Sequence, residues 1–487
     1  MMQPKGTTKN VASEAKTRRK ILEKRNIHAV FEHFDSFFNT IFANAAVLKG
    51  VSKVILLILG VFCPLTFATT MAYQLDNGLK VIVKPDHRAP LVVAQVWYKV
   101  GSSYEETGAT GLSHVLEHMM FKGTEKYGPG DYSQQIARLG GTENAFTGRD
   151  YTAYFATISA KHLSAVLALE ADRMHNLVLD QTEFAKEIEV VKEERRLRTD
   201  DKPTGLTYEQ LQAVAWRVSP YRNPVIGWMT DLDNMQLSDL QAWYERWYTP
   251  DNATLVVVGD VQPEAVLELA KQHFGTVPKR TMIPLKPQQE PQQQGMTQVS
   301  VRTSAQQPYL MMGYKTPVVG KSQEDWEPYA LAILSSILDG GESARLSREL
   351  VREQRIAASA GAQYNPYTRL SNLFFFSGTP TDGHSVDELQ QAFVGQIQRL
   401  KTVLLEKPDL QRVINQAVSA KVYEQDSLFY QAMQLGLLET IGLDWRLSAQ
   451  EIARLRAVTP EQVRTVAQRY LIDDNVTIAT LVPTQSE

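Results

Sequence analysis

Apolar and polar positions follow two different periods along the chain after residue 73. Residues 80–83 and 91–100 are dense in apolar and β-branched residues and predict strands. From about residue 112, apolar residues recur with the 3.6-residue period of a helix. Strands and helices do not alternate as regularly as in a doubly wound parallel sheet. The pattern therefore predicts a mixed α/β (α+β) fold with mixed or antiparallel sheets and packed helices.

One polar segment interrupts this pattern. Residues 284–295, PLKPQQEPQQQG, are rich in Pro and Gln and have no apolar anchor, so we expect a semi-extended linker. The segments on either side end alike, because an amphipathic helix, an Asp-Asn pair and an apolar strand follow one another in each. We therefore predict two related units, 73–283 and 296–487. The matching elements span 237–248, 251–252 and 253–258 in the first unit and 458–470, 474–475 and 476–482 in the second.

The composition is that of a globular protein. Of the 487 residues, 43% are hydrophobic and 22% are charged, which excludes a disordered, fibrous or polytopic membrane chain. The net charge of −3 gives no reason to expect nucleic acid as a partner. Cys63 is the single cysteine, which excludes an intrachain disulfide and a thiolate-rich metal site.

The first 72 residues differ from the rest in charge. They hold ten Lys or Arg against four acids, so they carry +6 and the other 415 residues carry −9. Residues 54–68, VILLILGVFCPLTFA, form an uncharged apolar run that follows basic residues, and candidate cleavage points lie after Ala68 and Ala72. These are the parts of a secretory signal, so we predict that residues 51–72 are a signal peptide or a signal anchor.

A signal that begins near residue 50 leaves residues 1–50 to be explained. They are either a basic cytoplasmic tail in front of an anchor, as the positive-inside rule permits, or a mis-called extension of a protein that starts at Val51. Both explanations predict export, either to the bacterial periplasm or to a membrane-anchored position that faces it.

The segment SHVLEH at residues 113–118 carries the clearest chemical signal. Its apolar spacing predicts a helix, with Thr110 or Ser113 as the cap. His114 and His118 then lie one turn apart on one face, which is the separation that lets two imidazoles bind one Zn²⁺. Glu117 lies on the same face, where its carboxylate can hold a water beside the metal. This is the inverted His-x-x-Glu-His order of zinc peptidases.

Two imidazoles do not complete a catalytic zinc site, which takes three protein ligands and one open position. Residues 183–196, EFAKEIEVVKEERR, predict a helix dense in acids that can supply the third ligand. Glu183, Glu187 and Glu194 fall near one face, because intervals of four and seven residues are close to whole turns. Spacing alone does not choose between Glu187, Glu193 and Glu194, and a solvated charged helix also explains the pattern.

Taken together, these motifs resemble the pitrilysin/insulinase family of zinc metallopeptidases, which includes the mitochondrial processing peptidase and its bacterial relatives. The resemblance covers nearly all of residues 73–487. It is carried by HVLEH and MMFKGT at 114–124, GGTENAFT at 140–147, EIEVVKEE at 187–194, Pro220-Tyr221, and the segment 252–260.

The resemblance implies a role for several residues. It makes Glu194 the third zinc ligand and Glu187 its supporting acid. It also implies that the strand containing Asn144 and Ala145 lies beside the site and pairs with an extended substrate. Members of the family fold as repeated α/β units, two in each half-clamshell, and hydrolyse peptides inside the closed chamber.

The sequence departs from the family pattern in its C-terminal unit. Full enzymes carry an Arg and a Tyr there, seven residues apart, that grip the substrate. The comparable stretch here is LVREQRIAAS at 350–359, where Arg352 is a candidate but Ala358 or Ser359 stands at the Tyr position. In paired systems of the family, one subunit brings zinc and the other brings this grip. We therefore expect a homologous partner subunit that supplies it, or a homodimer.

We thus expect a zinc metalloendopeptidase that hydrolyses unstructured peptides. One Zn²⁺ per chain would be held by His114, His118 and Glu194, with Glu117 as the general base. The alternative is a zinc-bearing structural or assembly subunit of a heterodimer without proteolytic activity. The intact Glu117 favours the enzyme, whereas the missing Tyr favours the alternative.

Overall fold

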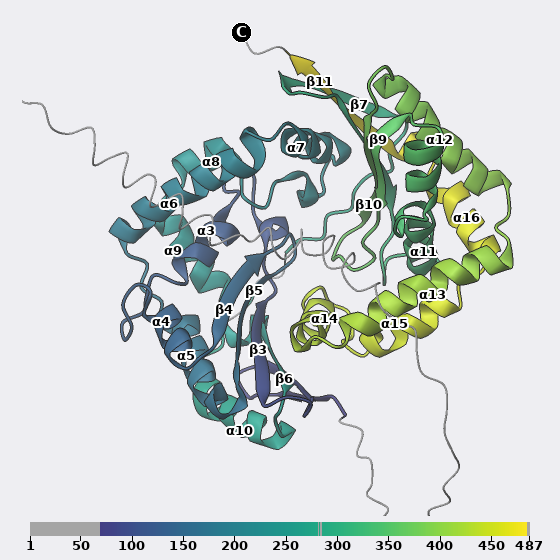
Figure 1. Ribbon diagram of the computed structural model, residues 1–487. Helices are drawn as coiled ribbons and strands as arrows, with labels where there is room; N and C mark the ends of the chain where they lie inside the picture. The colour runs from purple at the N-terminus through teal and green to yellow at the C-terminus, as the bar shows by residue number, and fades with distance from the viewer. Residues whose placement is uncertain (1–68, 281, 283–284, 485–487) are drawn as a thin grey trace, which may run out of the picture. The chain divides into compact units, whose positions relative to one another are not determined.

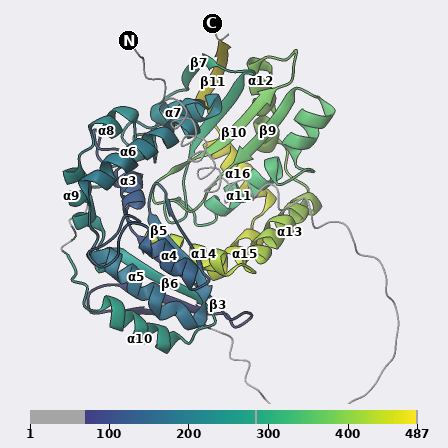
Figure 2. The same ribbon diagram turned by 60° about the vertical axis from the view of Figure 1, so that its left-hand side comes forward.

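Runs of apolar and β-branched residues form the central strands of two sheets in the computed structural model, which describes residues 69–280, 282 and 285–484 (Figure 1, Figure 2). Among these residues, the first sheet has the strand order β1-β2-β6-β3-β5-β4. Strands β2 and β6 are parallel, and the other neighbours are antiparallel. The strands are β1 Met71–Gln74, β2 Lys80–Pro85, β3 Leu91–Tyr98, β4 Thr142–Thr147, β5 Thr152–Ser159 and β6 Ala253–Gly259.

The second sheet repeats this arrangement. Its order is β7-β11-β8-β10-β9, with β7 and β11 parallel and the other neighbours antiparallel. Each strand after β1 therefore has a counterpart, and the prediction of two related mixed α/β units is confirmed. The strands are β7 Thr297–Ser304, β8 Tyr309–Thr316, β9 Ala357–Gln363, β10 Asn372–Pro380 and β11 Val476–Thr484.

The helices follow a similar order in both halves of the described chain. One helix follows β3 in the first half and one follows β8 in the second. A longer series of helices then precedes the last strand of each half, β6 and β11. In the first half they are α3 Leu112–Met119, α4 Asp131–Arg138, α5 Leu163–His175, α6 Gln181–Arg195, α7 Pro203–Ala215, α8 Met229–Asn234, α9 Leu237–Trp247 and α10 Pro263–Phe274. In the second half they are α11 Glu327–Asp339, α12 Val386–Thr402, α13 Lys407–Glu424, α14 Leu428–Thr440, α15 Leu447–Arg456 and α16 Pro460–Tyr470.

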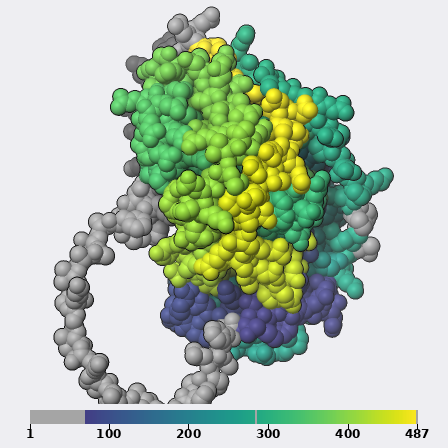
Figure 3. Space-filling view, turned by 90° about the vertical axis from the view of Figure 1, so that its right-hand side faces the viewer, coloured from purple at the N-terminus to yellow at the C-terminus, as the bar shows by residue number. Residues whose placement is uncertain are grey.

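Each sheet buries one face under helices of its own half and the other face under a helix of the opposite half. Helix α14 packs across β3 and β6, where Ala432 and Leu435 join a core around Trp97. Helix α7 packs on β7, β8 and β11, where Leu211 joins a core with Met311. The space-filling view shows the yellow and light-green C-terminal segments directly against the purple residues that follow residue 69 (Figure 3). The two halves therefore exchange one helix each.

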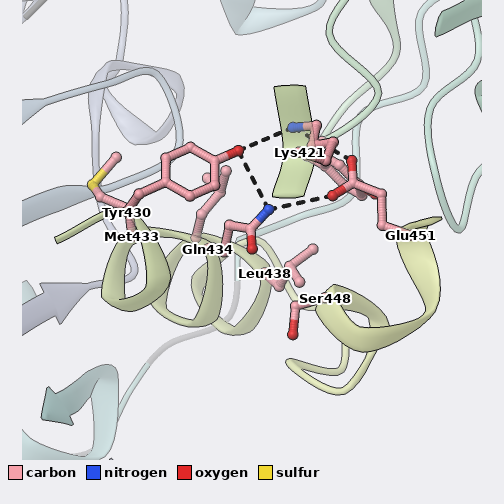
Figure 4. Close-up of a pocket in the computed structure, with 9 residues that line it drawn as sticks. Lys421, Tyr430, Met433, Gln434, Leu438, Ser448 and Glu451 are labelled. Carbon is pink, nitrogen blue, oxygen red and sulfur yellow. Dashed lines mark hydrogen bonds and ion pairs between the residues drawn. The ribbon is translucent and has the colours of Figure 1, made fainter. Parts of the chain in front are cut away.

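Helix α14 is held on both of its sides. A side chain at Gly436 would collide with the indole of Trp97, so glycine allows the close approach of α14 to the first sheet. On its other side, Tyr430 and Gln434 enter a polar network with Lys421 of α13 and Glu451 of α15 (Figure 4). This network borders a cavity of about 90 Å³, and its polar groups bond to one another. We therefore interpret it as an anchor for α14.

The polar segment between the halves has no helix or strand where it is described, but polar side chains attach it. Glu290 accepts hydrogen bonds from the backbone N–H groups of residues 217–219 and pairs with Lys315 at 2.8 Å. Gln293 is buried and donates to the carbonyl of Val476 at 2.8 Å. Leu285, near the start of the segment, also packs against the core of the first half, so the prediction that the segment has no apolar anchor is wrong.

The predicted N-terminal tail and most of the predicted signal, including Cys63, lie outside the described residues. Met71 and Ala72, the last residues of that predicted segment, begin strand β1, where they pair with Val83 and Ile82. None of the helices in the described part of the chain has the length and apolar character needed to cross a bilayer.

Arg369, in the loop between β9 and β10, joins the second half to the first. Its backbone N–H donates to Asp150 at 3.0 Å, and its guanidinium contacts the same carboxylate at 3.4 Å. The guanidinium also donates to the hydroxyl of Ser103 at 2.7 Å and lies over the ring of Tyr104. Asp150 is only 2% exposed and also accepts hydrogen bonds from Ser103 and Tyr221. A buried carboxylate therefore links the two halves.

We expect Arg369→Met to lower the free energy of unfolding by about 2 kcal/mol, because the carboxylate of Asp150 stays buried and loses a charged partner. Urea denaturation of the whole chain measures this. The matched control is Arg352→Met, whose ion pair with Glu342 is exposed, and it should change the value by less than about 0.5 kcal/mol. Equal effects of the two substitutions would contradict the role of Arg369.

Candidate metal centre

Helix α3 carries the histidine motif, and a buried carboxylate caps it. The helix starts after Gly111, whose φ of 92° suits glycine. Glu105 accepts hydrogen bonds from the backbone N–H groups of Gly111 and Ser113, both at 2.7 Å. The prediction that Thr110 or Ser113 caps the helix is therefore wrong, and the Thr110 hydroxyl instead donates to Asp231 at 2.6 Å. Burial raises the pKa of Glu105 to about 7, against the opposing effect of the two N–H donors.

The packing of α3 against α6 brings three potential ligands together. One ligand atom each from His114, His118 and Glu194 can be chosen so that all lie within 4.8 Å of one another. Nε2 of His114 lies 3.9 Å from one carboxylate oxygen of Glu194, and Nε2 of His118 lies 3.5 Å from the other. Tetrahedral bonds of about 2.0–2.1 Å to zinc would separate neighbouring ligand atoms by roughly 3.4 Å. The spacing and the donor types both fit zinc.

Two cations and a further acid surround this cluster. Glu187 accepts from Nδ1 of His118 at 3.2 Å, which leaves Nε2 of that ring as the atom available to a metal. Lys122 contacts the other oxygen of Glu187 at 2.5 Å, and Arg198 contacts Glu194 at 2.5 Å. His118 and Glu194 therefore have outer contacts of the kind that orient metal ligands in proteins, whereas Nδ1 of His114 has no hydrogen-bond partner.

Burial and charge set the protonation of the three potential ligands. Burial lowers the pKa of His114 to about 4, although the carboxylate of Glu194 opposes the shift, so this imidazole is neutral at pH 7. Burial also favours neutral His118, but hydrogen bonds to Glu187 and Glu194 outweigh it and raise the pKa to about 9. Burial opposes ionisation of Glu194, yet His118 and nearby positive charge lower its pKa to about 2. Glu194 is thus a carboxylate and can bind a cation.

Glu117 lies next to the cluster and is held from another element. It is 7% exposed, and the hydroxyl of Thr147, at the end of β4, donates to its Oε2 at 2.5 Å. Burial raises the pKa of Glu117, while the charge of His118 and the bond from Thr147 oppose the shift. A raised pKa suits a carboxylate that accepts and returns a proton near neutral pH.

Strand β4 is at the edge of the first sheet and pairs with β5 alone among the described strands. Asn144 is exposed on this strand, and Ala145 is buried. The backbone N–H of Ala145 donates to the amide oxygen of its neighbour Asn144 at 2.9 Å. An edge strand beside a metal cluster can accept an extended peptide by adding a strand.

The structure separates the other candidate residues from the cluster. Glu193 pairs with Arg196 at 3.1 Å on the exposed side of α6, so it is not directed at the histidines. Glu183, which spacing placed on the same face as Glu194, pairs with Lys186. Arg352 is exposed in the second half and pairs with Glu342 at 3.2 Å, so its role in substrate binding stays a prediction.

Four residues of the site were missed by reasoning from the sequence. Arg198 stands four residues after Glu194, and this spacing alone could have indicated the ion pair. Lys122 pairs with Glu187, 65 positions away, so no local spacing indicates that contact. Thr147 contacts Glu117, 30 positions away, and Glu105 accepts from Ser113, 8 positions away. Neither separation is a helical spacing that sequence reasoning would look for, so no local pattern reveals these two residues.

Comparison with family models divides the chain in two. Residues 80–228 match the model described as Insulinase (Peptidase family M16). Residues 234–417 match the model described as Peptidase M16 inactive domain. All three potential metal ligands and Glu117 lie within the first match.

Individual proteins support the same relationship. The zinc protease PqqE of Helicobacter pylori is 34% identical over 380 residues, which cover 76% of this chain and 84% of that protein. The uncharacterized zinc protease YmxG of Bacillus subtilis is 24% identical over 402 residues, covering 82% of this chain and 96% of that protein. A crystal structure of a protease from H. pylori has a TM-score of 0.82 at 30% identity and covers 85% of this chain and 100% of its own.

A more distant structure shares the fold. The periplasmic protease PqqL of Escherichia coli has a TM-score of 0.71 at 18% identity. The match covers 85% of this chain but 48% of PqqL, so the present fold corresponds to about half of that longer chain.

The cap of α3 leads to a prediction about stability. Glu105→Ala should lower the free energy of unfolding by about 2–4 kcal/mol, because two backbone N–H groups at the start of the helix lose their acceptor. Chemical denaturation tests this, with Glu106→Ala as the matched control, since Glu106 is the exposed neighbour. The control should stay within about 0.5 kcal/mol of the wild type. A loss below that limit for Glu105→Ala would show that the carboxylate does not cap the helix.

Proposed function

We propose that this chain, which belongs to the insulinase family (peptidase family M16), is a zinc-dependent endopeptidase that hydrolyses unstructured peptides. The observation that carries the proposal is the convergence of His114, His118 and Glu194 within 4.8 Å, with Glu117 beside them. Two relatives support it, because PqqE and YmxG are named zinc proteases.

His114, His118 and Glu194 would hold one zinc ion, with Glu187 orienting His118. When bound, zinc supplies Lewis-acid chemistry that polarises a carbonyl and lowers the pKa of water. Glu117 accepts a proton from the attacking water and later gives it to the leaving amine. Burial supports this role, because it keeps the pKa of Glu117 above its ordinary value.

Strand β4 would align the peptide. Its outer edge is unpaired among the described strands, so the backbone of an extended peptide can form main-chain hydrogen bonds along Asn144 and Ala145. Main-chain bonds give affinity with little dependence on the peptide's side chains. The expected substrates are therefore unfolded segments of varied sequence.

The alternative is a zinc-bearing subunit without proteolytic activity, and the two family matches and Glu117 bear on it. The match to the inactive-domain model covers residues 234–417, which contain none of the metal ligands. The half with the histidine motif matches the insulinase model instead. The Glu117 carboxylate, which a purely structural zinc site does not need, also favours the enzyme.

We also propose that a second unit completes the enzyme. The structural match covers 48% of PqqL, so a protein of that length has room for a second unit of similar size. A homologous partner subunit, or a second copy of this chain, would supply the Arg and Tyr grip on the substrate, because Ala358 or Ser359 stands where the Tyr is expected.

Hydrolysis of a quenched fluorescent peptide tests the proposed activity. With zinc, the protein alone or mixed with its homologous subunit should cleave the peptide, and a chelator should stop it. Glu117→Gln should retain about one zinc per chain but lose activity by about 10²–10⁴-fold, because it removes the general base. If the activity of this variant is close to that of the wild type, Glu117 is not the general base.

Glu193→Gln is the matched control for this experiment, because Glu193 lies on α6 next to Glu194 but pairs with Arg196 at the surface. It should keep both zinc and activity. Zinc binding without cleavage, alone and with the partner, would favour the non-proteolytic subunit.

We further propose that the chain is exported and that cleavage follows Ala68 and not Ala72. Cleavage after Ala72 would remove Met71 and Ala72 and with them half of strand β1, whereas cleavage after Ala68 leaves their pairing with β2 intact. N-terminal sequencing of the protein from the periplasmic fraction should begin at Thr69. A sequence that begins at Tyr73 would contradict this choice, and an intact N-terminus on membrane-bound protein would favour the signal anchor.

A further inference from the structure

Thr147 ends strand β4 and contacts Glu117 from outside the histidine helix. Its hydroxyl donates to Oε2 of Glu117 at 2.5 Å, although the two residues are 30 positions apart. Glu117 lies where little water competes for its carboxylate, since it is buried. Hydrogen bonds to charged groups in such surroundings are shorter and stronger than those between neutral groups.

The strand itself directs Thr147 toward the histidine helix. Side chains two positions apart in a strand share a face, so Thr147 is on the same side of β4 as Ala145. Ala145 is buried in the core that also contains Val115 and Leu116 of α3, and β4 contacts α3. A β-branched side chain has few rotamers, so the Thr147 hydroxyl is held in place by the backbone of β4.

We infer that Thr147 is a positioning residue for peptide hydrolysis. Its hydroxyl fixes Oε2 of Glu117 and leaves Oε1 free to accept the proton of the attacking water. Because Asn144 and Ala145 lie on the same short strand, one element both aligns the peptide and orients the base. The inference rests on the proposed function, since Glu117 acts as a base only if the chain hydrolyses peptides.

Steady-state kinetics of two substitutions test this role. Thr147→Val removes the hydroxyl but keeps the size and branching of the side chain. Its kcat should fall about 10- to 100-fold, because a hydrogen bond to a charged group is lost, while KM stays within about twofold and zinc content is unchanged. Thr147→Ser keeps a hydroxyl and should restore kcat to within about threefold of the wild type.

Thr303→Val is the matched control, because Thr303 lies on the edge strand β7 of the second sheet. It should leave kcat and KM unchanged. A wild-type kcat for Thr147→Val would overturn the inference, as would a Thr147→Ser variant as slow as Thr147→Val.

Crystal structures of the zinc-loaded wild type and Thr147→Val give a readout that does not depend on activity. The Glu117 carboxylate should leave its wild-type position in the variant, and an unchanged carboxylate would overturn the inference. If the wild type binds zinc but cleaves no peptide, the proposed function fails, while displacement of Glu117 in Thr147→Val would still support Thr147 as the residue that positions it.

Discussion

The packing of α3 against α6 is the interaction on which the cluster of potential metal ligands depends. One helix provides two imidazoles a turn apart, but a third ligand must come from a different element. Helix α6 directs Glu194 at both Nε2 atoms and Glu187 at Nδ1 of His118. Because Glu187 and Glu194 are seven residues apart, about two helical turns, both can face the same histidine.

This packing concentrates negative charge in a poorly solvated region. Glu117 of α3 and Glu187 and Glu194 of α6 all lie near the two histidines of α3. Burial opposes the ionisation of each of these carboxylates. Lys122 and Arg198 offset part of this charge at 2.5 Å from Glu187 and Glu194. A divalent cation held by the three ligands would add to that compensation, so the arrangement suits a cation better than an empty carboxylate cluster.

The second half repeats the architecture of the first without its histidine motif. Helix α11 follows β8 as α3 follows β3, but it is mostly apolar, and no histidine occurs between Glu327 and Asp339. Its first residue, the acid Glu327, is fully buried and pairs with Arg469 and Tyr470 of α16. The same position in the fold therefore carries the two histidines in one half and an apolar core helix in the other.

The sequence predicts those elements whose formation depends on residues close together in the chain. The strands, the histidine helix and the acidic helix all lie close to where the periodicity predicts them, because each buries a regular apolar face. Spacing alone did not identify Glu194, and not Glu193, as the third potential metal ligand. That choice came only from the family resemblance. In the structure it follows from the rotation of α6 about its axis, which packing against α3 determines.

Contacts between distant parts of the chain were not predictable in this way. The apolar faces of α7 and α14 look like those of any packed helix, and nothing local shows that each covers the sheet of the opposite half. The cap of α3 was predicted wrongly for a related reason. Ser and Thr are common caps, but a Glu outside the helix satisfies the same N–H groups.

The half without metal ligands contributes to the candidate site through the turn after β4. Thr147 and Asp150 stand at the two ends of this turn, three residues apart. The first holds Glu117, and the second is held by Arg369 of the other half. A displacement of the second half would pull on Asp150 and, through the short turn, on the residue that orients Glu117. The Arg369 contact therefore couples the second half to the turn that carries Thr147.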